Sequence, residues 1–243
     1  MSRTAFAAAC FAAGSLVCAP ALASGLQVSP VLVRIMERSS TVWLTNSGGT
    51  AMRAQVRVFH WTQDSGRDAY AATEEVLPSP PFVELSGGAK QLVRLVRRSM
   101  PGGAGAPCED AYRIAIDELP NPAAPPDGNG LRYRMSYSVP VFVTSRACRK
   151  EEPKLSFALP AAGTLAVANT GLIHAQLADA AIVTPDGRRT PLAKGLVGYV
   201  LPGSTINFTL GPRAGLPPQG SALEVTVNGK KVAQPLARTS SGQ

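Results

Sequence analysis

The chain has 243 residues, of which 45% are hydrophobic and 16% charged, and its formal net charge is +8. Its basic residues are scattered and have few aromatic neighbours, which argues against a nucleic-acid-binding protein. Glycine (23 residues) and proline (21 residues) interrupt the chain often and no long helical periodicity appears, so short strands are favoured over helices. A chain of this length suits two β-sandwich domains.

The first residues predict an export signal. Arg3 precedes an uncharged apolar run, Ala5–Val17, that is too short to span a membrane. Ala21-Leu22-Ala23 fits the small-residue rule for cleavage, so residues 1–23 are interpreted as a signal peptide. No later stretch has the roughly 18 uninterrupted apolar residues that a transmembrane helix needs, and we expect a soluble exported protein.

Alternating stretches separated by turn residues predict the strands of a first domain. Gly25–Arg34 is typical of a strand, but Pro30 indicates an edge or a bulge within it. Met52–Trp61 alternates strongly until Phe59 and Trp61 fall on the polar side, which predicts a twist or a bulge near His60. The remaining predictions are strands at 41–44, 91–96 and 112–119 and an extended segment between sheets at 77–83.

Leu131–Val143 is an unusually long alternating stretch. Its apolar face comprises Leu131, Tyr133, Met135, Tyr137, Val139, Val141 and Val143. Two interpretations are open: an ordinary core strand of a sandwich, or a strand whose first half is an exposed edge offered to another protein.

Two cysteines remain after the predicted signal, and in an exported chain they are expected to form one disulfide. If the strands at 112–119 and 131–143 form a hairpin around residues 121–130, Cys108 and Cys148 meet at its open end. Closing that loop is worth about 3–4 kcal/mol in the chain-entropy model. His60 and His174 stand alone, so no metal site is expected.

Arg149–Pro153 is interpreted as a linker, with the first domain at 24–148 and a second at 154–237. Asn228-Gly229 predicts a type I′ turn in a terminal hairpin. Gly198–Ser204 is expected to begin a strand pair with 205–210. Further strands are predicted at 155–159, 164–169 and 174–182.

Motifs of enzymes are missing. The stretch Ser86–Lys90 lacks the spacing and the hydroxyl residue of a phosphate-binding loop. Asp117 and Glu118 are adjacent, so on a strand they face opposite ways and cannot act as a paired acid and base. We expect neither an enzyme nor a cofactor.

Several stretches in order resemble the periplasmic chaperones of pilus (fimbrial) assembly, in particular the archaic chaperone-usher branch. The resemblance covers nearly the whole mature chain. The stretches are Phe59-His60-Trp61 with the following turn, Ser79-Pro80-Pro81-Phe82, Gln91–Leu95, Tyr112–Pro120, Val139–Val143 and Gly198–Gly203.

This resemblance implies an all-β fold of two immunoglobulin-like sandwiches set at an angle. It also implies a periplasmic protein that completes the open fold of a pilus subunit with its own edge strand, and delivers the subunit to an outer-membrane usher. Self-association of the free chaperone through that edge is a further expectation. The alternative interpretation is a structural β-sandwich protein, such as a pilus subunit or a surface adhesin.

The resemblance also implies roles for single residues. Leu131, Tyr133, Met135, Tyr137 and Val139 match the donor side chains of the edge strand. Glu118 matches a glutamate that holds the two domains in a fixed orientation. The family's cationic anchor for the subunit's C-terminal carboxylate falls on Leu32 and Pro140 here, which leaves Arg34, and less so Arg94, as candidate anchors.

Overall fold

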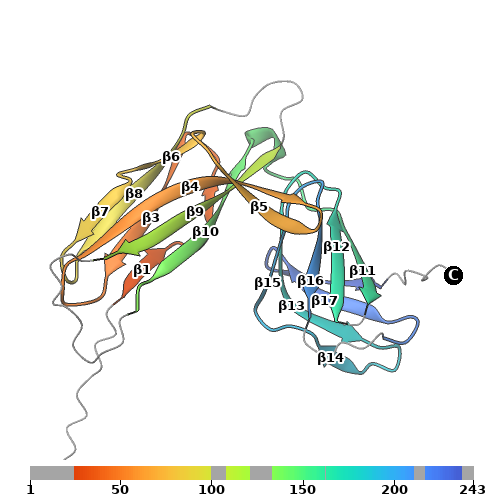
Figure 1. Ribbon diagram of the computed structural model, residues 1–243. Helices are drawn as coiled ribbons and strands as arrows, with labels where there is room; N and C mark the ends of the chain where they lie inside the picture. Colours follow the sequence, from red (N-terminus) through yellow and green to blue (C-terminus); the bar gives the residue numbers. More distant parts are fainter. Residues whose placement is uncertain (1–24, 100–107, 121–132, 162, 211–216, 237–243) are drawn as a thin grey trace, which may run out of the picture.

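The computed structural model describes residues 25–99, 108–120, 133–161, 163–210 and 217–236. These residues are almost entirely β-structure and form two lobes set at an angle to each other (Figure 1). Each lobe consists of two sheets packed around a hydrophobic core of its own. The expected fold class, all-β with two sandwiches at an angle, is confirmed.

The first sandwich has a four-stranded and a six-stranded sheet. The four-stranded sheet has the order β1-β3-β8-β6, formed by β1 (Leu26–Ser29), β3 (Ser39–Asn46), β8 (Lys90–Arg97) and β6 (Val76–Ser79). The six-stranded sheet has the order β2-β10-β9-β4-β5, with β7 also paired to β4. Its strands are β2 (Val33–Ile35), β10 (Ser136–Thr144), β9 (Glu109–Leu119), β4 (Met52–Asp64), β5 (Arg67–Ala72) and β7 (Phe82–Leu85).

Prolines mark the places where the chain changes sheets. The strand predicted at 25–34 is in fact two strands, because Pro30 ends β1 in one sheet and β2 begins in the other. Pro80 and Pro81 separate β6 from β7 in the same way, as the predicted extended segment between sheets requires. A proline has no N–H to donate, so it suits a crossing better than the middle of a strand.

The β4 strand has no bulge near His60. Its pairing with β9 runs without a shift from Arg53 to His60. Met52, Ala54, Val56 and Val58 point into the first core, whereas Trp61 points to the opposite face and is buried there against the second lobe. The apolar side of β4 therefore changes near His60 because the second lobe covers the opposite face of the strand there.

The second sandwich has a three-stranded and a five-stranded sheet. The first contains β11 (Leu155–Ala161), β12 (Thr164–Asn169) and β16 (Thr205–Thr209). The second contains β14 (Arg189–Pro191), β13 (Ala175–Val183), β17 (Ala222–Val227), β18 (Lys230–Pro235) and β15 (Leu196–Val200). A short 3-10 helix, η1 (Arg146–Cys148), follows the first sandwich.

Sequence reasoning about the second sandwich was correct for the last hairpin and wrong for one pair. The β17–β18 hairpin turns at Asn228 and Gly229, whose φ angles of 47° and 83° are those of a type I′ turn. The pair expected between 198–204 and 205–210 does not form, because β15 pairs with β13 and β16 pairs with β12. The turn at 201–204 carries the chain between sheets instead.

The predicted disulfide hairpin is present. The strands β9 and β10 are antiparallel, with Glu109 opposite Thr144 at their open end. Cys108 and Cys148 are bonded there, and their Cα atoms are 5.6 Å apart. The disulfide closes the hairpin at the end nearest the second lobe.

Candidate functional site

The strand β10 has one edge that is only partly covered. On one side it pairs with β9 along its whole length, Ser136–Thr144. On the other side it pairs with β2, but only from Val141 to Val143. Among the strands that the structure describes, none covers this side from Ser136 to Pro140. We call this stretch the open edge, because its unpaired main-chain groups can form hydrogen bonds with another strand.

From Tyr133 to Val139 the side chains change from exposed to buried. Tyr133 is 79% exposed and Met135 38%, whereas Val139 is 3% exposed and lies in the first core. Tyr137 is half-buried, and its hydroxyl donates a hydrogen bond to a main-chain carbonyl of β1. Val139 is therefore a core residue, which corrects the expected donor role. Leu131 lies outside the described residues.

Polar contacts hold the start of this segment against β9. The Glu118 N–H donates to the carbonyl of Met135 at 2.9 Å, and the Met135 N–H donates to the Glu118 carboxylate at 3.1 Å. The Ser136 hydroxyl donates to Asp117, which also pairs with Arg57 at 2.7 Å. These two hydrogen bonds hold the pKa of Asp117 below its ordinary value. Residues 133–135 precede β10, and Met135 is hydrogen-bonded to the neighbouring strand β9.

The two candidate anchor arginines lie on different sheets. Arg34 is the middle residue of β2 and faces away from the first core, like its cross-strand neighbour Phe142, toward the second lobe. Arg94 is exposed on the outer face of the four-stranded sheet, between Thr41 and Ser79. Because that face is on the other side of the sandwich, Arg94 is removed as a candidate anchor, and Arg34 remains one.

The second lobe packs on the outer face of the six-stranded sheet. A buried cluster joins them, formed by Trp61, Ala111, Phe142, Tyr199 and Leu201. The side-chain amide of Gln63 donates to the carbonyl of Tyr199 at 2.9 Å and accepts from the N–H of Leu201 at 2.8 Å. This side chain thereby forms the hydrogen bonds that a neighbouring strand would otherwise provide.

The carboxylate that joins the two lobes is Glu109. Its Oε1 accepts hydrogen bonds at 2.7 Å from both the main-chain N–H and the Nδ1 of His174. Glu118 lies near the opposite end of β9 and bonds to Met135 within the first lobe. The interdomain role expected for Glu118 is thus corrected, since the contact belongs to a glutamate that sequence reasoning did not single out.

Arg113 is a second junction residue that sequence reasoning missed. Its guanidinium lies over the Trp61 ring at 4.0 Å and is 5.4 Å from the Tyr199 ring centre. Burial raises the pKa of Tyr199, while the charges of Arg113 and Arg34 oppose this rise. Both arginines therefore act on the same tyrosine. In the structure Arg113 lies opposite Pro140 in the β9–β10 ladder.

Comparison with known proteins identifies the family. The model of the PapD N-terminal domain, described as pili and flagellar-assembly chaperone, matches residues 25–147. This chain belongs to the pilus and flagellar assembly chaperone family. The expected family is thereby confirmed, and no match was found among curated proteins.

Solved structures of similar fold include pilus chaperones. One belongs to the CsuC-CsuE chaperone-tip adhesion subunit pre-assembly complex from archaic chaperone-usher Csu pili of Acinetobacter baumannii, with 24% identity, 89% of this chain and 100% of that chain covered, and a TM-score of 0.66. Another is the E. coli chaperone DraB, with 18% identity, coverage of 88% and 97%, and a TM-score of 0.59. At these identities the likeness establishes the fold.

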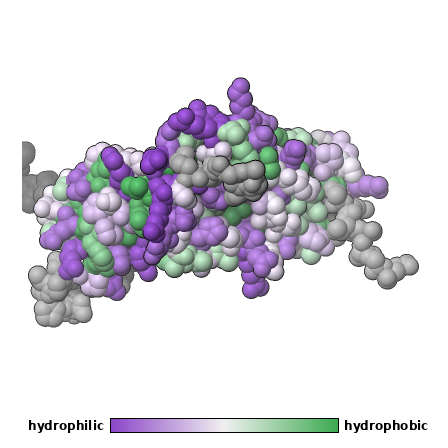
Figure 2. Space-filling model, turned by 90° about the horizontal axis from the view of Figure 1, so that it is seen from above, coloured by the Kyte–Doolittle hydropathy of each residue, from purple (hydrophilic) through white to green (hydrophobic). Residues whose placement is uncertain are grey.

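Apolar exposure by itself does not locate the binding site of this chaperone. The first lobe also exposes Trp43, Leu77 and Phe82, which lie away from β10 in the chain and in the sheets. On the face seen from above, apolar side chains lie among hydrophilic ones over the first lobe (Figure 2). Leu77 in β6 and Phe82 in β7 also lie on strands with a neighbour on one side only. The strand β10 differs from them because β2 pairs with its second half and leaves open the first half, which follows Tyr133 and Met135.

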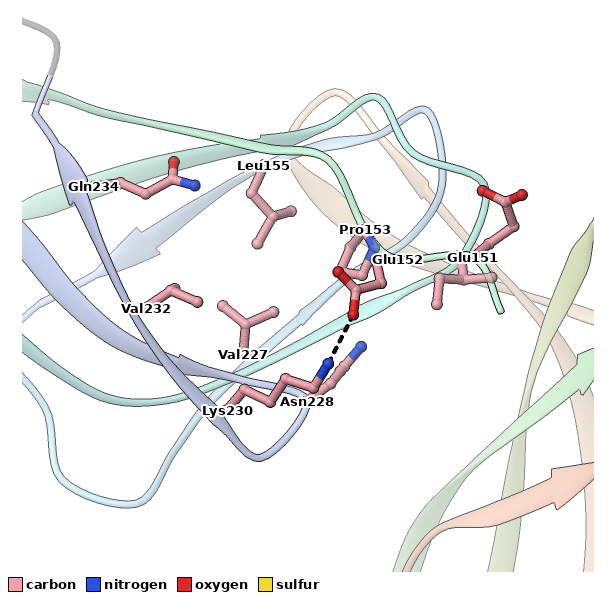
Figure 3. A pocket seen from close by; sticks show the side chains of 10 residues that line it. Glu151, Glu152, Pro153, Leu155, Val227, Asn228, Lys230, Val232 and Gln234 are labelled. Atoms are coloured by element: carbon pink, nitrogen blue, oxygen red, sulfur yellow. Dashed lines mark hydrogen bonds and ion pairs between the residues drawn. The ribbon is translucent and has the colours of Figure 1, made fainter. Parts of the chain in front are cut away.

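A cavity of about 270 Å³ lies in the second lobe of the chaperone, away from the open edge. Leu155 and Val232 line it, and the exposed ion pair of Glu152 with Lys230 stands at one side (Figure 3). The chaperone family is non-enzymatic in general. Within the described ranges, no three His, Cys, Asp or Glu residues are placed to hold a metal ion, and no helix is long and apolar enough to cross a membrane.

Proposed function

We propose that this protein is a periplasmic chaperone that captures pilus subunits by strand donation and delivers them to an outer-membrane usher. The observation that carries the proposal is the open edge at Ser136–Pro140, preceded by the exposed side chains of Tyr133 and Met135. A subunit that lacks a strand has unpaired main chain and an open core. We call Tyr133–Pro140 the donor segment, because it offers both missing parts.

The donor segment suits partners of varied sequence. Main-chain hydrogen bonds along the open edge would supply affinity that does not depend on side chains, and alternate side chains would fill pockets. Burial of Tyr133 or Met135 would contribute about 1.5–3 kcal/mol each. Methionine adapts its shape and tyrosine buries a large area, so both serve as pocket fillers. No cofactor or nucleotide takes part in this binding.

The position of β2 favours one direction for the bound strand. The strand β2 runs parallel to β10 and occupies its edge from Val141 onward. A subunit strand in line with β2 would thus end where β2 begins, at the junction. Arg34 lies there, and a guanidinium favours a carboxylate over an amino group. We therefore infer that the subunit's C-terminal carboxylate faces Arg34.

The test is capture of a subunit in the periplasm. The chaperone would be co-expressed with pilus subunits of the same organism and purified from periplasmic extract by a tag on the chaperone. We expect a one-to-one complex in which the subunit is protected from proteolysis. If the chain bound no subunit and instead polymerised alone, the chaperone proposal would be lost and the structural-protein alternative favoured.

Two further outcomes concern the free chaperone and the usher. The open edge invites pairing with a second copy, so size-exclusion chromatography with light scattering should show a dimer that dissociates when subunit is added. The subunit complex, but not the free chaperone, should bind membranes that contain the usher. A complex that never transfers its subunit to the usher would contradict the delivery step.

A further inference from the structure

One residue of the donor segment has a side chain that solvent oxidants can modify. Met135 is 38% exposed, and its thioether is the one sulfur in the donor segment. The other described methionines are less accessible, since Met36 is half-buried and Met52 is 8% exposed in the first core. The two described cysteines are bonded to each other and offer no free thiol. Among the described residues, the sulfur of Met135 is therefore the one that a peroxide reaches most easily.

We propose that Met135 is a reversible oxidation site, and that its conversion to methionine sulfoxide prevents the capture of a subunit. The effect on capture rests on the proposed function, whereas the preferential oxidation of Met135 is independent of it.

The chemical step is a two-electron oxidation of the sulfur by a peroxide. A lone pair of the Met135 sulfur attacks one oxygen of hydrogen peroxide, and the O–O bond breaks. The other oxygen leaves as hydroxide and takes the proton of the transferred OH group, so the products are a sulfoxide and water. A methionine sulfoxide reductase reverses the change. The sulfoxide oxygen then leaves as water while a dithiol is oxidised to a disulfide.

Main-chain hydrogen bonds hold Met135 in place while its side chain stays accessible. Its N–H donates to the Glu118 carboxylate at 3.1 Å, and its carbonyl accepts from the Glu118 N–H at 2.9 Å. Its γ-carbon lies toward Gly25, which has no side chain to cover it. Met135 is not among the side chains of the first core. Oxidation of its sulfur therefore leaves the packing of the sandwich intact.

The modification acts on the bound state. In the proposed complex Met135 fills an apolar pocket of the subunit. A sulfoxide oxygen is a hydrogen-bond acceptor, and its burial without a donor is unfavourable. In the free chaperone the same oxygen remains in water. Oxidation is thus expected to weaken binding without weakening the fold, whereas oxidation of the buried Met52 would disturb the core.

The first measurement is the rate of sulfoxide formation at each methionine. The full chain is purified from periplasmic extract under non-reducing conditions, treated with hydrogen peroxide and digested, and mass spectrometry follows the gain of one oxygen. We expect Met135 to react at least about tenfold faster than Met52, and at least about tenfold more slowly once a bound subunit covers it. Equal rates at Met135 and Met52 in the free chain would overturn the proposal.

The second measurement is capture before and after oxidation. Peroxide is removed, and titration calorimetry with a purified subunit compares the treated and the untreated chaperone. We expect oxidation to weaken capture about thirtyfold or more and to leave the urea midpoint unchanged. Methionine sulfoxide reductases should restore capture, with the disulfide between Cys108 and Cys148 checked by mass. Full affinity of a chaperone whose Met135 is oxidised would overturn the effect on capture.

A matched pair of variants assigns the effect to one sulfur. Leucine fills a similar volume without an oxidisable atom, so Met135→Leu should have nearly the same affinity before and after peroxide. Met36→Leu, which keeps Met135, should show the full loss. Peroxide sensitivity that persists in Met135→Leu would overturn the proposal. If the untreated chaperone captured no subunit, the proposed function would fail, and the rates at Met135 and Met52 would still decide whether Met135 is the oxidation site.

Discussion

The two halves of β10 differ in sequence and in surroundings, because polar and apolar residues alternate up to Val139 whereas Val141, Phe142 and Val143 are all apolar. From Val141 onward the strand lies between β9 and β2, and both its faces are buried, one in the first core and one against the second lobe. From Ser136 to Pro140 the strand has a neighbour on one side only. The difference shows that one strand can be a rigid support at one end and an available edge at the other.

The largest effect is expected from charging the exposed end. Tyr133→Arg combined with Met135→Arg should weaken subunit capture about a thousandfold or more, because two side chains worth about 1.5–3 kcal/mol each are lost and charges enter apolar pockets. Titration calorimetry with a purified subunit measures the loss, and the urea midpoint should stay unchanged. Unfolding of this variant would show that both side chains are core.

Removing the covalent support should affect stability instead. Cys108→Ser with Cys148→Ser is expected to lower the free energy of unfolding by about 3–4 kcal/mol, because a loop across 40 residues is no longer closed in the unfolded chain. Urea denaturation followed by fluorescence measures this change. A loss of capture with normal stability would indicate that the disulfide serves the donor segment rather than the fold.

A matched pair of alanine variants contrasts the two halves directly. Val141→Ala should cost about 2 kcal/mol, since it removes buried methyl groups from a fully enclosed position. Ser138→Ala, on the open edge, should change stability by less than about 0.5 kcal/mol. The same denaturation experiment serves both, and equal losses would remove the distinction between the halves.

The proposed anchor gives a smaller effect. Arg34→Ala should weaken capture about tenfold, the loss expected when a charged hydrogen bond is removed, while Arg94→Ala on the other sheet should leave capture unchanged. A subunit with an amidated C-terminus should bind both the unmodified chaperone and Arg34→Ala equally. Wild-type affinity of Arg34→Ala would remove Arg34 from the anchor role.

The smallest effect is expected at the tether of the donor segment. The pKa of Asp117 is lowered by Ser136 and Arg57, so its stabilising contribution is present above the ordinary value of 3.8 and is lost as the pH falls further. Asp117→Asn should therefore cost less than about 1 kcal/mol at pH 7, as expected for a partly exposed pair. The difference from wild type should vanish in acid, and a difference that persists at pH 2 would contradict this assignment.

Sequence reasoning predicted strands of the first lobe because polar and apolar residues alternate along them. The disulfide followed from Cys108 and Cys148 at the ends of two predicted strands, and the type I′ turn followed from Asn228-Gly229. It failed at Trp61 and Glu109, which also contact residues of the other lobe. Periodicity tells which side of a strand is apolar, but contains no information on which element covers that side.

For the donor segment, the sequence by itself determined an alternating strand, the apolar residues on one face and the cysteines that close its hairpin. Tertiary structure alone decided that β2 covers β10 only from Val141 onward, which leaves the open edge, and that Val139 faces inward to the core. It also decided that Glu109, and not Glu118, reaches the second lobe. The physical reason is that edge, core and junction are relations between distant segments, whereas alternation is a property of one segment.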